Sequence, residues 1–152
     1  MEILPGIGVG VGGEAVRIGD ARDAVERVTG PSDAGALARK VAYGPPTNLV
    51  VHYAPDRTVE AVAVGYGEGD EATYDGVHLT GRFLDDVLAD LAARGLTSTP
   101  SDIGRDFHAG FSVFSMSSAY GADLGLTDGG DDERLVSEGV HVAPYATFAQ
   151  PA

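Results

Sequence analysis

Three histidines lie in short apolar segments that are typical of β-strands. His52, His78 and His141 each stand between two apolar residues, in the segments VHY, VHL and VHV. Because successive side chains of a strand point to opposite faces, each imidazole is expected on the face opposite its apolar neighbours. If the three strands are neighbours in one sheet, the imidazoles converge and could bind a small ligand, or Zn²⁺ with a carboxylate as a further ligand. Unrelated surface histidines give the same pattern, so both interpretations stay open.

A cluster of acidic residues offers a second candidate metal site. Its carboxylates belong to Asp128, Asp131, Asp132 and Glu133, and a Gly-Gly pair separates the first from the second. Calcium binds several carboxylate and carbonyl oxygens, so these four residues are candidate metal ligands. Their spacing differs from that of an EF-hand loop, and a Gly-Gly turn between acids is also typical of a solvated hairpin connection. The cofactor therefore stays unassigned.

Tyrosines supply a third group of candidate binding residues. Tyr53 and Tyr66 each stand at the end of a segment that predicts a strand. Tyrosine is enriched at protein interfaces because it combines a large apolar ring with a hydroxyl group. Tyrosines also pack half-buried on the sheets of many domains. With the three histidines, Tyr53 and Tyr66 form the candidate binding set.

The sequence contains no recognisable catalytic motif. Cysteine is absent, which excludes disulfides, a thiolate nucleophile and thiolate metal ligands. Ser112 and Ser115 occur in an alternating segment that predicts a strand with one polar face, and no serine has the G-x-S-x-G setting of a hydrolase nucleophile. Asp85 and Asp86 point about 100° apart on a helix and cannot act as an acid–base pair. No residue is assigned a catalytic role, and a non-enzymatic protein is the favoured interpretation.

Two amphipathic helices and several short strands are predicted to position these residues. Apolar residues recur at helical spacing over residues 21–28 and 82–94, and Asp20 is expected to cap the first helix. Alternating or β-branched segments predict strands at residues 16–18, 48–53, 58–66, 77–79, 111–116 and 136–143. The glycine-rich segment 1–13 has neither periodicity and is expected to form a loop or a loosely held arm.

The predicted elements recur along the chain. The pattern G-x-x-x-D-x-V begins at Gly19 and again, 62 residues later, at Gly81, each time at the start of a predicted helix. Predicted strands follow in the same order. One helix on one small sheet buries little apolar surface, so two such units are expected to share a sheet. The sequence thus predicts a single α+β domain over residues 1–152, with internal repeats at 14–67 and 76–145. Its antiparallel sheet is expected to carry two main helices on one face.

The segment from Ile18 to Val25, continued to Gly30 and Pro31, resembles a pattern shared by two groups of proteins. These are the SmpA/OmlA (BamE-like) lipoproteins and the tandem-repeat fold of the β-lactamase inhibitor protein. The resemblance implies helices packed on an antiparallel sheet that presents a binding surface to another protein. This chain lacks the lipidated cysteine of the first group and the disulfides of the second. No functional residue is carried over.

The composition limits the classes of partner. Asp and Glu outnumber Lys and Arg, which gives a net charge of −13 and a sequence pI near 4.4. The negative electrostatic field of such a chain repels nucleic acid phosphates and anionic lipids, so neither nucleic acid nor a membrane surface is an expected partner. The N-terminal segment lacks the early basic region and apolar core of a secretory signal, so a cytoplasmic location is expected. Either a halophilic source or a GC-rich genome explains the acidity.

Two functional hypotheses follow. The first is a non-enzymatic protein-interaction module, of an accessory or immunity type, whose partner is another protein or a second copy of the chain. The alternative is a metal-dependent enzyme or a small-ligand-binding protein that uses histidines and carboxylates on a sheet face.

Overall fold

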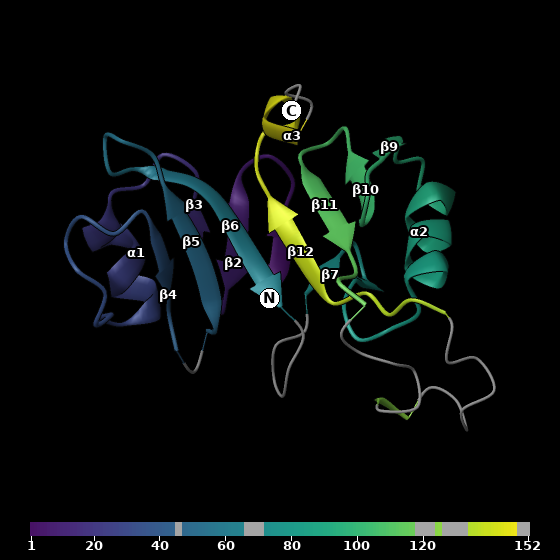
Figure 1. The fold of residues 1–152 in the computed structure, drawn as a ribbon, viewed down its shortest axis with the longest axis horizontal. Coiled ribbons are helices and arrows are strands. Elements are labelled where there is room, and N and C mark those ends of the chain that lie inside the picture. Colours follow the sequence, from purple (N-terminus) through teal and green to yellow (C-terminus); the bar gives the residue numbers. More distant parts are fainter. Residues whose placement is uncertain (45–46, 66–71, 118–123, 126–133, 149–152) are drawn as a thin grey trace.

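The computed structural model describes residues 1–44, 47–65, 72–117, 124–125 and 134–148. Within these ranges the chain forms two β-sheets and three α-helices, so it has the α+β class that the sequence predicts (Figure 1).

The larger sheet has seven strands, each antiparallel to its neighbours, in the order β4-β5-β6-β12-β11-β10-β9. The strands are β4 (Lys40–Ala42), β5 (Leu49–Tyr53), β6 (Val59–Gly65), β12 (Gly139–Val142), β11 (Phe111–Phe114), β10 (Gly104–Phe107) and β9 (Ser98–Pro100). At its centre, β6 pairs with β12, the last of the described strands in sequence order.

The smaller sheet has five strands in the order β3-β2-β1-β7-β8. They are β1 (Glu2–Leu4), β2 (Gly8–Val11), β3 (Glu14–Arg17), β7 (Thr73–Tyr74) and β8 (Val77–His78). β1 is antiparallel to β2 but parallel to β7, which it meets at Glu2 and Thr73. The first strand therefore joins two hairpins that are far apart in the sequence.

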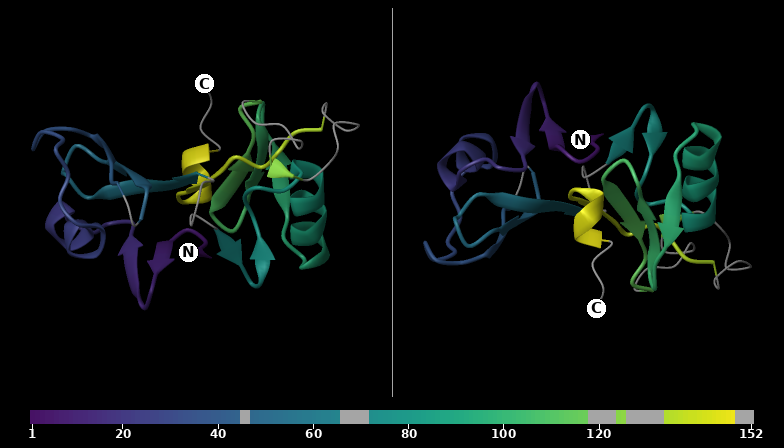
Figure 2. Two further views of the ribbon diagram at one scale, coloured as in Figure 1. Left: turned by 90° about the horizontal axis from the view of Figure 1, so that it is seen from below. Right: turned by 90° about the horizontal axis from the view of Figure 1, so that it is seen from above.

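The helices are α1 (Arg22–Thr29), α2 (Leu84–Ala93) and the single turn α3 (Tyr145–Phe148). α1 and α2 flank the smaller sheet at opposite ends of the molecule (Figure 2). None of the helices in the described ranges combines the length and the apolar character needed to cross a membrane.

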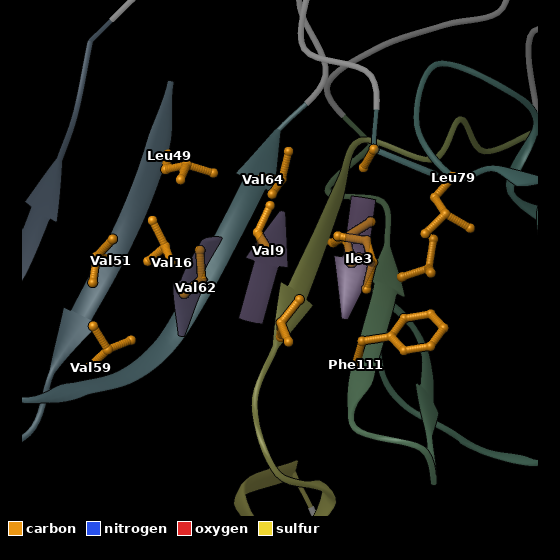
Figure 3. Close-up of a cluster of buried hydrophobic side chains, with 14 of the residues drawn as sticks. Ile3, Val9, Val16, Leu49, Val51, Val59, Val62, Val64, Leu79 and Phe111 are labelled. Atoms are coloured by element: carbon orange, nitrogen blue, oxygen red, sulfur yellow. The ribbon is translucent and has the colours of Figure 1, made fainter. Parts of the chain in front are cut away.

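Side chains from the two sheets meet in one hydrophobic core (Figure 3). Ile3, Val9 and Val16 from the smaller sheet are at most 1% exposed, and they face alternate residues of the larger sheet such as Val62 and Val64. The period of two in the burial of β5 and β6 is the pattern from which these strands are predicted.

The presence of a second sheet corrects the prediction of a single sheet. α1 has eight residues and α2 has ten, and they bury only two and three residues, respectively. Such short helices leave most of a seven-stranded face uncovered. The five-stranded sheet covers it instead, which gives two packed layers around a shared core.

The prediction of an N-terminal loop or arm is also wrong, because residues 1–13 contain β1 and β2. Glycines break the alternation of apolar and polar residues, so the strand signal is weak. Gly8 is required by close packing, since a Cβ at this position would overlap the carbonyl oxygen of Val16 on the paired strand. Val9, between two glycines, is fully buried.

The first helix begins one residue later than predicted and has no side-chain cap. Ala21 occupies the N-cap position. The carboxylate of Asp20 instead accepts a hydrogen bond from the Arg17 backbone N–H at 2.9 Å, within the turn that precedes the helix.

Each main helix follows the same pair of backbone hydrogen bonds. In both places the N–H of a glycine donates to the carbonyl oxygen of a residue at or near the start of a central strand. The N–H of that same residue donates to the carbonyl oxygen of the residue that follows the glycine. The four bonds are Gly19 to Val59 (2.8 Å), Val59 to Asp20 (2.8 Å), Gly81 to Ser137 (2.8 Å) and Ser137 to Arg82 (2.7 Å).

Candidate functional site

The candidate site lies on the outer face of the seven-stranded sheet, the face turned away from the five-stranded sheet. Residues directly opposite one another in neighbouring strands share a face. One such row crosses six strands and contains Val50, Ala63, His141, Ser112, Asp106 and Thr99. The row brings an imidazole, a hydroxyl and a carboxylate onto adjacent strands β12, β11 and β10.

Two of the three predicted histidines come together on this outer face. The ring centroids of His52 and His141 are 5.5 Å apart. Burial lowers the pKa of His141, and the neighbouring His52 lowers it further. Burial also lowers the pKa of His52, with a smaller effect from Lys40. Both rings are therefore neutral at pH 7, and the His141 Nε2 is buried without a hydrogen-bond partner among the described residues.

The other predicted binding residues are elsewhere. His78 lies on β8 in the smaller sheet, where it is exposed. Tyr53 is only 2% exposed, which places it in the core rather than on an open face. Tyr66 lies outside the described residues, as do the candidate metal ligands Asp128, Asp131, Asp132 and Glu133.

The described residues do not assemble a metal-ligand set. Within those ranges, no three side chains of His, Cys, Asp or Glu lie close enough together to hold a metal ion. In this part of the chain, His52 and His141 thus form a pair to which no described residue adds a third ligand. The charges near His52 do not favour a cation strongly either, because the positive charge of Lys40 opposes the negative charge of Glu60 there.

The helix α3 packs on the outer face through two histidine–aromatic contacts. The ring of Tyr145 meets His108 edge to face at 4.7 Å, and Phe148 meets His141 in the same way at 5.5 Å. The Tyr145 hydroxyl also shares a hydrogen bond with Thr99 Oγ1 at 3.0 Å. Figure 2 shows α3 on the side of the larger sheet opposite the smaller sheet.

A pocket of about 540 Å³ opens beside α3. Its apolar walls come from Ile103, Phe114, Met116 and Phe148, and its polar lining comes from Ser101, Asp102, Asp106, Ser112 and His141. Met116 is 61% exposed and Ile103 is 42% exposed. Burial raises the pKa of the Asp106 carboxyl.

The order of polar groups in this pocket suits binding rather than nucleophilic catalysis. In a catalytic triad, the imidazole lies between the carboxylate and the hydroxyl, so that it can take the hydroxyl proton. Here Ser112 lies between His141 and Asp106 in the strand register. The structure forms no Ser112–His141 hydrogen bond within the described residues.

Sequence reasoning found the histidine of this pocket and placed Ser112 on the polar face of a strand, but it missed Asp106 and Phe148. The off-phase position of His141 in an apolar strand was the signal, although His78 has the same signal and lies on the smaller sheet. Asp106 lies in a strand with weak alternation, and Phe148 lies in a four-residue helix, so neither has a local motif. Only the strand order reveals that they face the same space.

A second, larger pocket of about 630 Å³ lies beside α1, but its buried polar groups are bonded to one another. Arg22 forms an ion pair with Glu26 at 2.6 Å and donates to two backbone carbonyls. The Tyr43 hydroxyl donates to Glu26 at 2.9 Å and lies 2.8 Å from the hydroxyl of Tyr53. These contacts hold α1 on the sheet and leave the outer-face pocket as the better candidate site.

Comparisons with protein-family models, with curated proteins and with solved structures find no match to this chain.

Proposed function

We propose that this chain is a non-enzymatic protein-interaction module whose partner binds on the outer face of the seven-stranded sheet, at the pocket beside α3. The observation that carries the proposal is the exposure of apolar side chains around that pocket. Met116 is 61% exposed there and Ile103 is 42% exposed, next to the partly buried rings of Phe114 and Phe148. Clustered exposed apolar side chains with a polar rim are typical of protein interaction sites.

The polar groups of the pocket support binding over chemistry. Ser112 lies between His141 and Asp106, and the described residues provide no metal-ligand set. The net charge of −13 disfavours nucleic acid and anionic membranes as partners and favours a basic protein. The proposed partner is therefore another protein, encountered in the cytoplasm.

We also propose that residues 14–67 and 76–145 are two copies of one unit, with the two main helices on the same side of the larger sheet. The matching hydrogen bonds at Gly19 and Gly81 support this repeat. The same order of a strand, a helix and antiparallel strands supports it as well. The repeat agrees with the resemblance to the tandem helix-on-sheet fold of the β-lactamase inhibitor protein, in which the sheet presents the binding surface.

Capture of partners from extracts of the source cells tests the proposed function. Tagged wild-type chain is compared with Met116→Asp, which places a charge on the apolar rim of the pocket. Leu37→Asp is the matched control, because Leu37 is 75% exposed and lines the other pocket. We expect one protein to be retained in stoichiometric amount by the wild type and by Leu37→Asp, and to be lost with Met116→Asp.

Retention of that protein by Met116→Asp would refute the outer-face site, and the absence of any stoichiometric partner of the wild type would refute the module. Light scattering on the same three proteins covers self-association. If the wild type and Leu37→Asp are dimers and Met116→Asp is a monomer, the partner at this site is a second copy of the chain.

A further inference from the structure

Asp106 is a partly buried carboxylate for which the described residues supply no counter-charge. It lies on β10 between Ser112 and Thr99 in the strand register. Within the described residues, its carboxylate has neither an ion pair nor a hydrogen bond. A charge that loses water without gaining a partner is unfavourable, so a carboxylate in this setting is suited to a cation from outside the chain.

The lining of the outer-face pocket does not supply that cation. It includes two carboxylates, those of Asp102 and Asp106, and neither Lys nor Arg among its described residues. His141 does not supply the charge either, because burial and the neighbouring His52 keep its imidazole neutral at pH 7. A neutral ring can accept a hydrogen bond at Nε2, and this atom is buried without a partner among the described residues.

The apolar lining of the pocket fits a planar or alkyl-ammonium cation. Phe114 and Phe148 are aromatic, and the face of an aromatic ring attracts guanidinium and ammonium groups. Met116 and Ile103 offer surface to the alkyl stem of a lysine or arginine side chain. In such a side chain, the charge would pair with the carboxylate, the guanidinium or ammonium group would lie against the two aromatic rings, and the alkyl stem would contact the apolar rim.

We propose that the outer-face pocket binds an arginine or lysine side chain of the partner protein, with Asp106 as its counter-charge and Phe114 and Phe148 as its aromatic contacts. This assignment rests on the proposed function and names the chemistry of the partner's contact residue. The acidic surface of the whole chain agrees with a basic partner segment, since its field attracts cations before contact.

Titration with blocked amino acids at pH 7.5, followed by NMR, tests this proposal. The ligands are N-acetyl-arginine methylamide and its neutral analogue, N-acetyl-citrulline methylamide. We expect the arginine ligand to shift the resonances of Asp106, Ser112 and Phe148 with a Kd of roughly millimolar size, as is typical of one side chain. The citrulline ligand should bind about tenfold more weakly, because it lacks the charge.

Asp106→Asn should weaken arginine binding about tenfold, whereas Asp33→Asn, which removes one exposed charge elsewhere, should leave it unchanged. Equal binding of arginine and citrulline, or unchanged binding in Asp106→Asn, would overturn the proposal. So would tighter binding of agmatine than of the blocked arginine, which would indicate a free amine as the ligand.

The capture assay separates failure of this proposal from failure of the proposed function. If the partner is lost with Met116→Asp but retained by Asp106→Asn, the outer-face site stands and the cation assignment fails. If the blocked arginine binds in an Asp106-dependent manner while Met116→Asp still retains the partner, the cation pocket stands and the proposed function fails.

Discussion

Replacing Tyr43 by Phe removes one hydroxyl from the buried chain of hydrogen bonds that joins α1 to the seven-stranded sheet. The Tyr43 hydroxyl donates its one hydrogen to Glu26, so the Tyr53 hydroxyl must be the donor in the Tyr43–Tyr53 bond. In Tyr43→Phe, the carboxylate of Glu26 therefore loses a donor, and the Tyr53 hydroxyl loses its acceptor. Tyr53 is 2% exposed, so water cannot readily replace that acceptor.

These contacts set the expected loss of stability. A hydrogen bond to a charged group contributes about 1.5–3 kcal/mol, and a buried unsatisfied hydroxyl costs about 1–3 kcal/mol. The first value is an upper limit, because Glu26 keeps Arg22 and its side chain is 26% exposed. Removing the Tyr43 hydroxyl also removes the cost of burying it. We expect Tyr43→Phe to lower the free energy of unfolding by about 2–3 kcal/mol.

Urea denaturation at pH 7 measures this loss. With a slope near 2 kcal/mol per molar urea, the midpoint should fall by about 1–1.5 M. Tyr74→Phe is the matched control, because the Tyr74 hydroxyl has no hydrogen bond within the described residues, and it should change stability by less than about 0.5 kcal/mol. An equal effect of the two substitutions would refute the hydrogen-bonded chain.

The effect of Tyr43→Phe also depends on pH. Burial acts to raise the pKa of the Glu26 carboxyl, but hydrogen bonds from Arg22 and Tyr43 hold it below its ordinary value. The stability from these bonds is present above the unfolded pKa and is lost as the pH falls through the folded pKa. The difference between Tyr43→Phe and the wild type should therefore shrink below about pH 4.

Two further predictions concern the smaller sheet and the histidine pair. Gly8→Ala should lower the free energy of unfolding by about 1–3 kcal/mol or more in urea melts, because its Cβ meets the Val16 carbonyl. The control is Gly10→Ala on the same strand, where the new Cβ meets nothing closer than 3.6 Å, and it should cost under about 1 kcal/mol. The lowered pKa values of His52 and His141 mean that the unfolded chain binds protons first, so stability should decline as the pH falls below 6.5. His141→Gln should flatten this decline between pH 6.5 and about pH 5, and an unchanged slope would contradict the neutral pair.

Local periodicity was sufficient to predict the main elements. The helix predicted over residues 82–94 is observed as α2, and the strand over 48–53 as β5, because their apolar residues keep one period throughout. Periodicity failed at residues 1–13, where glycines allow close strand packing, and at β7, which has only two residues. Strands that short have no period to detect.

The candidate site was only partly predictable, since it depends on contacts between distant segments. The off-phase positions of His52 and His141 indicated the face on which they lie. Their proximity depends on the pairing of β6 with β12, which no local pattern specifies. Asp106 reaches the same face through two more strands, and for that reason its role could only be inferred from the structure.

The pairing of β6 with β12 also affects how the chain folds during synthesis. The strand β6 emerges from the ribosome long before residues 139–142, so its valine-rich edge has no native partner on that side until those residues have been made. Unpaired strand edges are sites of association between nascent chains. Slow synthesis of the second half would therefore prolong the period in which this protein is most prone to aggregate.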